Sequence, residues 1–65
     1  MTNFNEDDEV VCINTKNEVF CGMVCGNFVF SPNWDNAKPL TFRKTTYIRM
    51  YVPTCEYVLA EEFYR

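Results

Sequence analysis

The sequence predicts an all-β domain, and two observations carry this prediction. Val, Ile, Thr and the aromatic residues together make up 26 of the 65 residues, and these side chains suit the half-buried surface of a sheet. Ala and Leu, which are strong helix formers, occur only four times in total, and no long stretch shows the periodicity of an amphipathic helix. The pattern favours a small five-stranded antiparallel barrel, which removes free sheet edges by closure.

The first half of the chain is predicted to form a meander of three strands. Residues 9–14 and 18–25 are the first two strands, joined by a turn at residues 14–17 that is rich in Asn and Thr. Gly26 and Asn27 then match a two-residue hairpin turn that begins with glycine. Residues 28–30 therefore return as the third strand.

The register of this meander decides which side chains share a face of the sheet. When the first turn is centred on Thr15 and Lys16, apolar side chains fall on both faces rather than on one. The first face then holds Val11, Ile13, Phe20, Val24 and Val29. The second face then holds Val10, Cys12, Val19, Cys21, Met23, Cys25, Phe28 and Phe30. Because a sheet that is apolar on both faces must be covered on both, we expect self-association or a partner protein to cover one of them.

The second half of the chain is predicted to add a loop, a second hairpin and a helical turn. The loop spans residues 31–39 and contains two prolines. Residues 45–52 are predicted to form the fourth strand, because Thr46, Ile48, Met50 and Val52 alternate with Tyr47, Arg49 and Tyr51. A Pro-Thr turn leads into residues 55–60 as the fifth strand. Residues 60–64 are predicted to form one short C-terminal helical turn that closes the end of the barrel.

Negative charge gathers at the start of the chain, although the net charge is only −3. Residues 1–8 are predicted to be a flexible acidic leader, and residues 9–65 a single small β-barrel domain.

A domain of this size buries only about 60% of the surface that its unfolded chain exposes. The chain is therefore expected to hold one small core and no second domain.

The composition argues against catalysis. The chain has no histidine and a single serine, which removes Ser–His and Cys–His nucleophilic pairs and every metal site that contains histidine. No glycine-rich phosphate loop is present either. We therefore expect no enzyme activity, no cofactor and no small-molecule substrate.

The chain also shows no signal for a membrane or for export. It contains no apolar run of 18 residues, and its acidic start differs from a secretory signal. These observations predict a cytoplasmic protein that does not cross a membrane.

The four cysteines are predicted to be small buried hydrophobes. They are Cys12, Cys21, Cys25 and Cys55. Their spacing contains no C-x2-C knuckle, which is the signature of a structural zinc site. This spacing predicts no metal site. Thiols stay reduced in the cytosol, which also argues against a disulfide. Zinc binding and oxidation to a disulfide are the alternatives.

Three segments of the chain resemble the small SH3-like barrel proteins that are frequent in bacteriophage and prophage genomes. These segments are residues 9–14 (EVVCIN), residues 40–48 (LTFRKTTYI) and residues 57–63 (YVLAEEF). Arg43 stands where that family usually has glycine, and residues 17–38 make a longer excursion than its typical members have. The resemblance implies an SH3-like barrel, a viral origin and a location in the cytoplasm of a bacterial host.

Binding is then the expected function. The resemblance suggests a phage protein that inhibits or retargets a host protein by stoichiometric contact, such as a defence nuclease, a CRISPR effector or a transcription component. The candidate contact residues are Trp34, Asp35, Phe28, Phe30, Glu6, Asp7, Asp8 and Glu9. Trp residues dominate many interfaces, and carboxylates speed encounters with basic partners. Trp34 could instead fold over the mouth of the barrel as part of the core.

Two other functions are compatible with the sequence. Aromatic and basic residues that interleave on a sheet can stack bases and hold phosphates, which gives the candidate nucleic-acid contacts Arg43, Lys44, Arg49, Tyr47 and Tyr51. The net charge of −3 argues against this alternative, since phosphate contacts dominate such binding. The same basic residues could simply balance the acidic leader within the molecule. The remaining alternative is a self-assembling structural or virion component, that is, a homo-oligomer.

Overall fold

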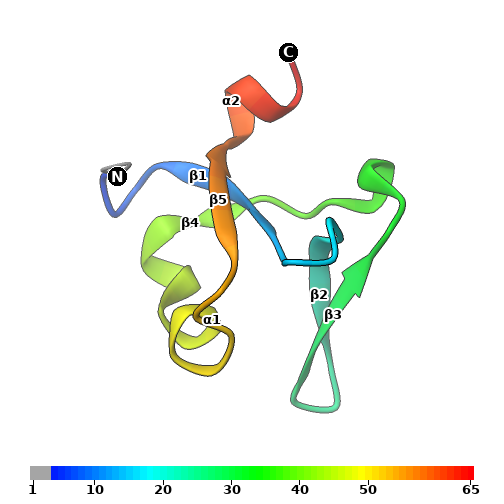
Figure 1. Ribbon diagram of the computed structural model, residues 1–65. Helices are drawn as coiled ribbons and strands as arrows, with labels where there is room; N and C mark the ends of the chain where they lie inside the picture. The colour runs from blue at the N-terminus through cyan, green and yellow to red at the C-terminus, as the bar shows by residue number, and fades with distance from the viewer. Residues whose placement is uncertain (1–3) are drawn as a thin grey trace.

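The computed structural model describes residues 4–65 and shows five strands in an antiparallel sheet (Figure 1). The predicted β class is therefore confirmed. The strands are β1 (Glu9–Ile13), β2 (Val19–Val24), β3 (Asn27–Ser31), β4 (Leu40–Thr41) and β5 (Glu56–Leu59). The helical elements are the 3₁₀ turns η1 (Trp34–Asn36) and η2 (Phe42–Thr45) and the α-helices α1 (Thr46–Tyr51) and α2 (Ala60–Phe63).

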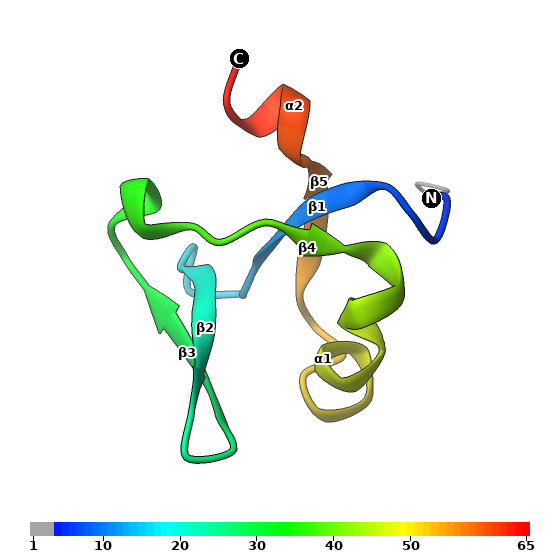
Figure 2. The same cartoon turned by 180° about the vertical axis from the view of Figure 1, so that it is seen from behind.

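β1 is the strand that joins the others. One of its edges pairs with β5 from Val10 to Ile13. Its other edge pairs first with β4, at Glu9 and Val10, and then with β2, at Ile13. Figure 2 shows β4 beside β1, with the β2–β3 hairpin extending away from it. The sheet order is β3-β2-β1-β4, with β5 on β1.

The strand pairing does not close into the predicted barrel. Across residues 4–65, β3 pairs only with β2, and no pairing joins β3 to β4 or to β5. The outer edge of β3 therefore ends the sheet. The predicted C-terminal helical turn is confirmed as α2, which lies within the expected range of residues 60–64.

The predicted strand over residues 45–52 is wrong, because these residues form the end of η2 and the helix α1. Two threonine hydroxyls donate to backbone carbonyls three residues earlier, from Thr45 to Phe42 (2.6 Å) and from Thr46 to Arg43 (2.8 Å). These bonds stabilise the tight turn in which the helix begins. The helix ends at Tyr51, because Pro53 disfavours helical geometry in Val52, the residue before it.

The first turn differs from its expected register by one residue. Asn17 adopts a positive φ of 63°, and the Asn14 side-chain oxygen accepts from the backbone N–H groups of Lys16 and Glu18. The loop is thereby one residue longer than predicted, and Ile13 pairs with Val19. A slip of one residue moves a whole strand's side chains to the other face. Val19 therefore packs with Val11, and Phe20 packs with Cys12.

The second hairpin turn also lies one residue earlier than predicted. Its two central residues are Cys25 (φ 51°) and Gly26 (φ 78°), and Val24 pairs with Asn27. Two consecutive positive φ angles are typical of the hairpin turn that matches the strand twist. The β2–β3 pairing also contains an irregularity between Phe20 and Gly22.

Two small apolar clusters lie on either side of β1. The first consists of Val11, Val19 and Ala60, with Ile13, Ala37 and Phe63 against it. The second consists of Cys12, Phe20 and Ile48, with Phe28, Phe30, Leu40, Val52, Cys55 and Tyr57 against it. Both faces at β1 are thus covered by this chain itself, through α2 and α1. The expectation that one face needs a partner is therefore wrong for this part of the sheet.

The described part of the predicted acidic leader contacts η2. The Phe4 ring lies 5.2 Å from the Phe42 ring. The N–H groups of Phe42 and Arg43 donate to the carbonyls of Asp8 (2.8 Å) and Glu6 (3.0 Å). Residues 1–3 of the leader lie outside the described residues.

We predict that Ile48→Ala lowers the free energy of unfolding by roughly 2–4 kcal/mol, because it leaves a cavity between α1 and the sheet. Ile48 is 1% exposed and is the buried anchor of α1. Urea denaturation followed by circular dichroism measures the change. Met50→Ala is the matched control on the same helix, since Met50 is 67% exposed, and it should change stability by less than about 0.5 kcal/mol. Equal losses in the two variants would contradict the placement of α1.

Candidate functional site

An open cleft lies between the β2–β3 hairpin and α1. It has a volume of about 360 Å³ and is lined by Met23, Gly26, Asn27, Phe28, Tyr47 and Tyr51. None of these six residues carries a charge. In Figure 1 the hairpin and α1 both extend from the same end of the sheet, away from α2. We call this site the hairpin–α1 cleft.

Two tyrosines one helical turn apart form the α1 wall of the cleft. Tyr47 and Tyr51 are spaced i, i+4 and therefore share a face of the helix. Both residues are largely exposed to solvent, Tyr47 at 67% and Tyr51 at 71%. Buried Ile48 holds the helix against the core, so the tyrosines are presented on a fixed element.

The hairpin wall combines a flexible side chain with a packed ring. Met23 is 58% exposed near the end of β2. Phe28 is half-buried, with its ring 6.2 Å from Phe20 and 6.3 Å from Tyr51. The contact between Phe28 and Tyr51 joins the two walls. The cleft can therefore accept an apolar or aromatic group, and its two tyrosines carry hydroxyls that can hydrogen-bond to a partner.

The arginines of the nucleic-acid alternative are engaged within the molecule. Arg43 forms ion pairs with Glu6 (3.1 Å) and Asp7 (3.6 Å). The Arg49 guanidinium lies 4.4 Å from the centre of the Phe42 ring, and its Nε–H donates to the Thr45 hydroxyl (3.1 Å). These contacts occupy both cations with groups of their own chain.

The lysine of that alternative borders a different hollow. Lys44 and Lys38 border a groove of about 470 Å³ between β2 and β4, together with the carboxylate residue Glu9. Tyr47 and Tyr51, by contrast, line the hairpin–α1 cleft. This groove and the cleft share Met23 in their linings, so Lys44 and the two tyrosines border adjoining hollows, while Arg43 and Arg49 line neither.

The acidic residues are likewise divided between different roles. Glu6 and Asp7 pair with Arg43, and the Asp8 carboxylate accepts from the Asn5 N–H (2.9 Å). A shallow hollow of about 320 Å³ is bordered by Asp7, Asp8, Glu9, Leu59, Ala60 and Glu61. The predicted acidic contacts are thus near one another, but none of them lines the hairpin–α1 cleft.

Trp34 is packed against the fold while remaining partly accessible. Its ring stacks on Phe63 at 5.3 Å, and its Nε1–H donates to the Asn17 carbonyl (2.9 Å). It is 40% exposed. The ring therefore ties η1 to α2 and to the first turn. Asp35, the next residue, is exposed in η1.

Of the eight predicted partner contacts, only Phe28 lines the cleft. Phe30 is half-buried, with its ring 5.9 Å from Phe20. Sequence reasoning missed Met23, Gly26 and Asn27, and it placed Tyr47 and Tyr51 on a strand. The i, i+4 spacing of the two tyrosines, followed by a proline two residues later, was the available signal for a short helix.

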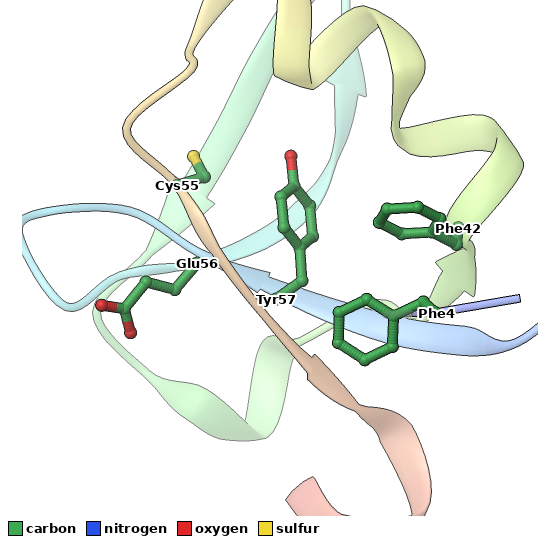
Figure 3. Close-up of a pocket in the computed structure, with 5 residues that line it drawn as sticks. All are labelled: Phe4, Phe42, Cys55, Glu56 and Tyr57. Carbon is green, nitrogen blue, oxygen red and sulfur yellow. The ribbon is translucent and has the colours of Figure 1, made fainter. Parts of the chain in front are cut away.

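A further pocket of about 310 Å³ is lined by Phe4, Phe42, Cys55, Glu56 and Tyr57 (Figure 3). The Tyr57 hydroxyl and the Cys55 sulfur point the same way, away from the Glu56 carboxylate (Figure 3). The Tyr57 oxygen is enclosed and has no hydrogen-bond partner among the residues that the structure describes. Burial raises the pKa of Tyr57 above its ordinary value.

All four cysteines are free thiols. Burial, with a further contribution from Cys55, raises the pKa of Cys12 well above its ordinary value, so this thiol remains protonated and unreactive. Cys25 is exposed at the tip of the hairpin. Within residues 4–65, no group of three or more Cys, Asp or Glu side chains is placed to hold a metal ion. In the same part of the chain, no helix has the length and apolar character needed to cross a membrane.

No family model, no curated protein and no solved structure matches this chain. The resemblance to phage SH3-like barrels therefore stays a prediction of the sequence.

We predict that Trp34→Ala lowers the free energy of unfolding by about 2 kcal/mol, less than the loss typical of a fully buried aromatic ring. The variant loses the stacking on Phe63 and the hydrogen bond to Asn17. Thermal and urea denaturation measure the effect. Asp35→Ala, a change at the exposed neighbour, is the control and should leave stability unchanged. Wild-type stability in Trp34→Ala would contradict a structural role for this ring.

We predict that Tyr57→Phe leaves the free energy of unfolding at pH 7 unchanged or raises it by up to about 1 kcal/mol, because the hydroxyl that it removes has no partner. The folded state holds the Tyr57 proton more tightly than the unfolded state does, whose pKa is near 10. The stability from this difference is full below pH 10 and is lost as the pH rises further. Urea denaturation at pH 7 and above pH 10 should therefore show a smaller alkaline loss in Tyr57→Phe than in wild type. Tyr47→Phe, at an exposed ring, should retain the full alkaline loss.

Proposed function

We propose that this chain is a small binding protein that inhibits or retargets another protein by stoichiometric contact, and that the hairpin–α1 cleft is its contact surface. The observation that supports this most strongly is the exposure of Tyr47 and Tyr51 beside Met23, in a cleft with no charged residue. Exposed apolar patches of this kind mark interaction sites in soluble proteins.

The residue types in the cleft suit protein recognition. Tyrosine supplies a large rigid ring with a polar tip, and it is enriched among the residues that dominate binding energy. Methionine adapts its shape to a partner. Met50 on α1 is also 67% exposed and extends the apolar surface of the helix. A partner with an apolar or aromatic side chain at its centre would fit this site.

The charge distribution favours a protein over a nucleic acid. Binding to a phosphate backbone requires several free cations on one surface, whereas Arg43 and Arg49 are engaged within the chain. The net charge of −3 adds repulsion from phosphate. For these reasons we do not extend the proposal to nucleic acid.

The expectations about the protein's origin, its location and the identity of its target rest on the sequence resemblance alone. The bacteriophage origin, the host cytoplasm and a host target such as a defence nuclease, a CRISPR effector or a transcription component stay predictions. An SH3-like arrangement, with its strand pairing open at β3, stays a proposal for the fold family, supported by five short antiparallel strands with a C-terminal helical turn.

We predict that Tyr47→Ala and Tyr51→Ala each weaken binding to the partner about tenfold or more without unfolding the domain. Both side chains are more than 60% exposed, so their removal costs little stability. Tagged protein captures partners from a nuclease-treated bacterial lysate, and quantitative mass spectrometry compares the variants. The purified partner is then titrated by calorimetry to give the affinity and the stoichiometry.

Tyr64→Ala is the matched control, because Tyr64 is an exposed tyrosine (57%) on the α2 side of the molecule. A partner retained by Tyr64→Ala but lost by both cleft variants supports the proposal. A partner retained by all three variants shows that the cleft is not the contact surface. Salt-sensitive binding to oligonucleotides that is lost in Lys44→Ala would overturn the proposal in favour of the nucleic-acid alternative.

A further inference from the structure

The outer edge of β3 is an open strand edge. β3 pairs on one side with β2 and ends the sheet on the other. In Figures 1 and 2 it lies on the outside of the hairpin, away from α1 and β5. Apart from its ladder with β2, no backbone hydrogen bond reaches residues 27–31 from elsewhere in the described chain. This edge therefore presents unpaired backbone donors and acceptors.

The pairing pattern identifies which residues present these groups. The Phe20 carbonyl accepts from the Lys38 N–H (3.0 Å), so it points away from β3. Phe20 and its opposite residue Phe30 are then a pair without mutual hydrogen bonds, which turns the Phe30 N–H and C=O to the free edge. The same alternation, counted from the turn-flanking pair of Val24 and Asn27, turns the backbone groups of Phe28 outward.

This edge lacks the features by which proteins usually prevent strand pairing. Edge strands are commonly protected by charged side chains, prolines or bulges. β3 contains no charge and no proline, and residues 19–34 form an uncharged stretch between Glu18 and Asp35. The irregularity in the β2–β3 pairing lies on β2, between Phe20 and Gly22, so it does not interrupt the outer edge of β3. Nothing in the described sequence of β3 opposes the addition of another strand.

We propose that two copies of this chain pair through β3 in an antiparallel manner, with the two-fold axis at Val29. Val29 then lies opposite Val29 of the second copy. Phe28 lies opposite Phe30 of the second copy, and the outward N–H and C=O groups of these two residues exchange hydrogen bonds. The sheets of the two copies become one continuous sheet.

The self-complementary form of the edge favours a second copy as the occupant. The outward groups at Phe28 and Phe30 are placed symmetrically about Val29, which is the requirement of a two-fold interface. Antiparallel pairing also sets the base of one hairpin, flanked by Glu18 and Asp35, against the uncharged tip of the other. Acidic residues of the two copies therefore do not meet across this edge. A five-residue edge is smaller than a standard interface, so the pairing is weak and depends on concentration.

This inference does not rest on the proposed function, because it concerns the edge of β3 rather than the hairpin–α1 cleft. Partner binding through Tyr47 and Tyr51 can fail while the dimer forms, and the reverse also holds. The two proposals are therefore tested separately.

Amide hydrogen exchange by nuclear magnetic resonance tests the pairing on the unmodified chain. In the dimer, the Phe28 and Phe30 amides become protected as the protein concentration rises from micromolar to millimolar. The Val29 amide, which faces β2, is protected at every concentration and is the internal control. Sedimentation measures the mass over the same range. A monomer at all concentrations, or a dimer whose Phe28 and Phe30 amides stay unprotected, overturns the proposal.

Val29→Lys sets two like charges directly opposite one another at the two-fold axis and should weaken the dimer about tenfold or more. Val29→Thr keeps a β-branched neutral side chain and should retain the dimer within about threefold. Circular dichroism confirms that both variants fold. If folded Val29→Lys dimerises as wild type does, the interface lies elsewhere and the proposal is overturned. A strand peptide that protects the two amides in a chain that remains monomeric would show a foreign strand as the occupant instead.

Discussion

The structure depends on β1, which shares its two edges among three other strands. Val10, Val11 and Cys12 are fully buried, and their backbone pairs with β5 on one side and with β4 and β2 on the other. Because alternate residues of a strand face opposite ways, Val11 anchors one apolar cluster and Cys12 the other. A chain of 65 residues thereby builds two thin layers of core from a single five-residue strand.

This arrangement leaves the outer part of the β2–β3 hairpin without cover. β2 pairs with β1 only at Val19, so the hairpin soon extends beyond the buried centre. Met23 and Val24 near its tip are 58% and 61% exposed. Its contact with α1 at the tip is the pair of Phe28 and Tyr51. The aromatic cleft and the open edge of β3 are therefore two consequences of one fact, a hairpin longer than the core that supports it.

The sequence was sufficient for features that local chemistry decides and insufficient for those that distant contacts decide. The positions of β1, β2, β3 and β5 and of the C-terminal turn follow from apolar runs and turn residues. The helix α1 does not, since its β-branched and aromatic residues favour a strand and the burial of Ile48 decides otherwise. The turn with a positive φ at Asn17 shifts the β1–β2 register by one residue from the predicted one, so Val19 and Phe20 lie on the opposite faces of the sheet from those predicted. The cleft needed both features at once, which explains why only Phe28 among its hairpin residues was predicted.

The basic residues show how a linear pattern differs from a surface. Arg43 and Arg49 interleave with aromatic residues in the sequence, as in many nucleic-acid-binding proteins. In the structure each finds a partner nearby, the carboxylates of residues 6 and 7 or the ring of Phe42. The Arg43 ion pairs are well exposed and add little stability, but they offset the charge of Arg43 with the carboxylates of Glu6 and Asp7. What remains distinctive is the uncharged stretch of residues 19–34. Since charge opposes association between copies of an acidic chain, its absence from this stretch supports the contacts that we propose for the hairpin.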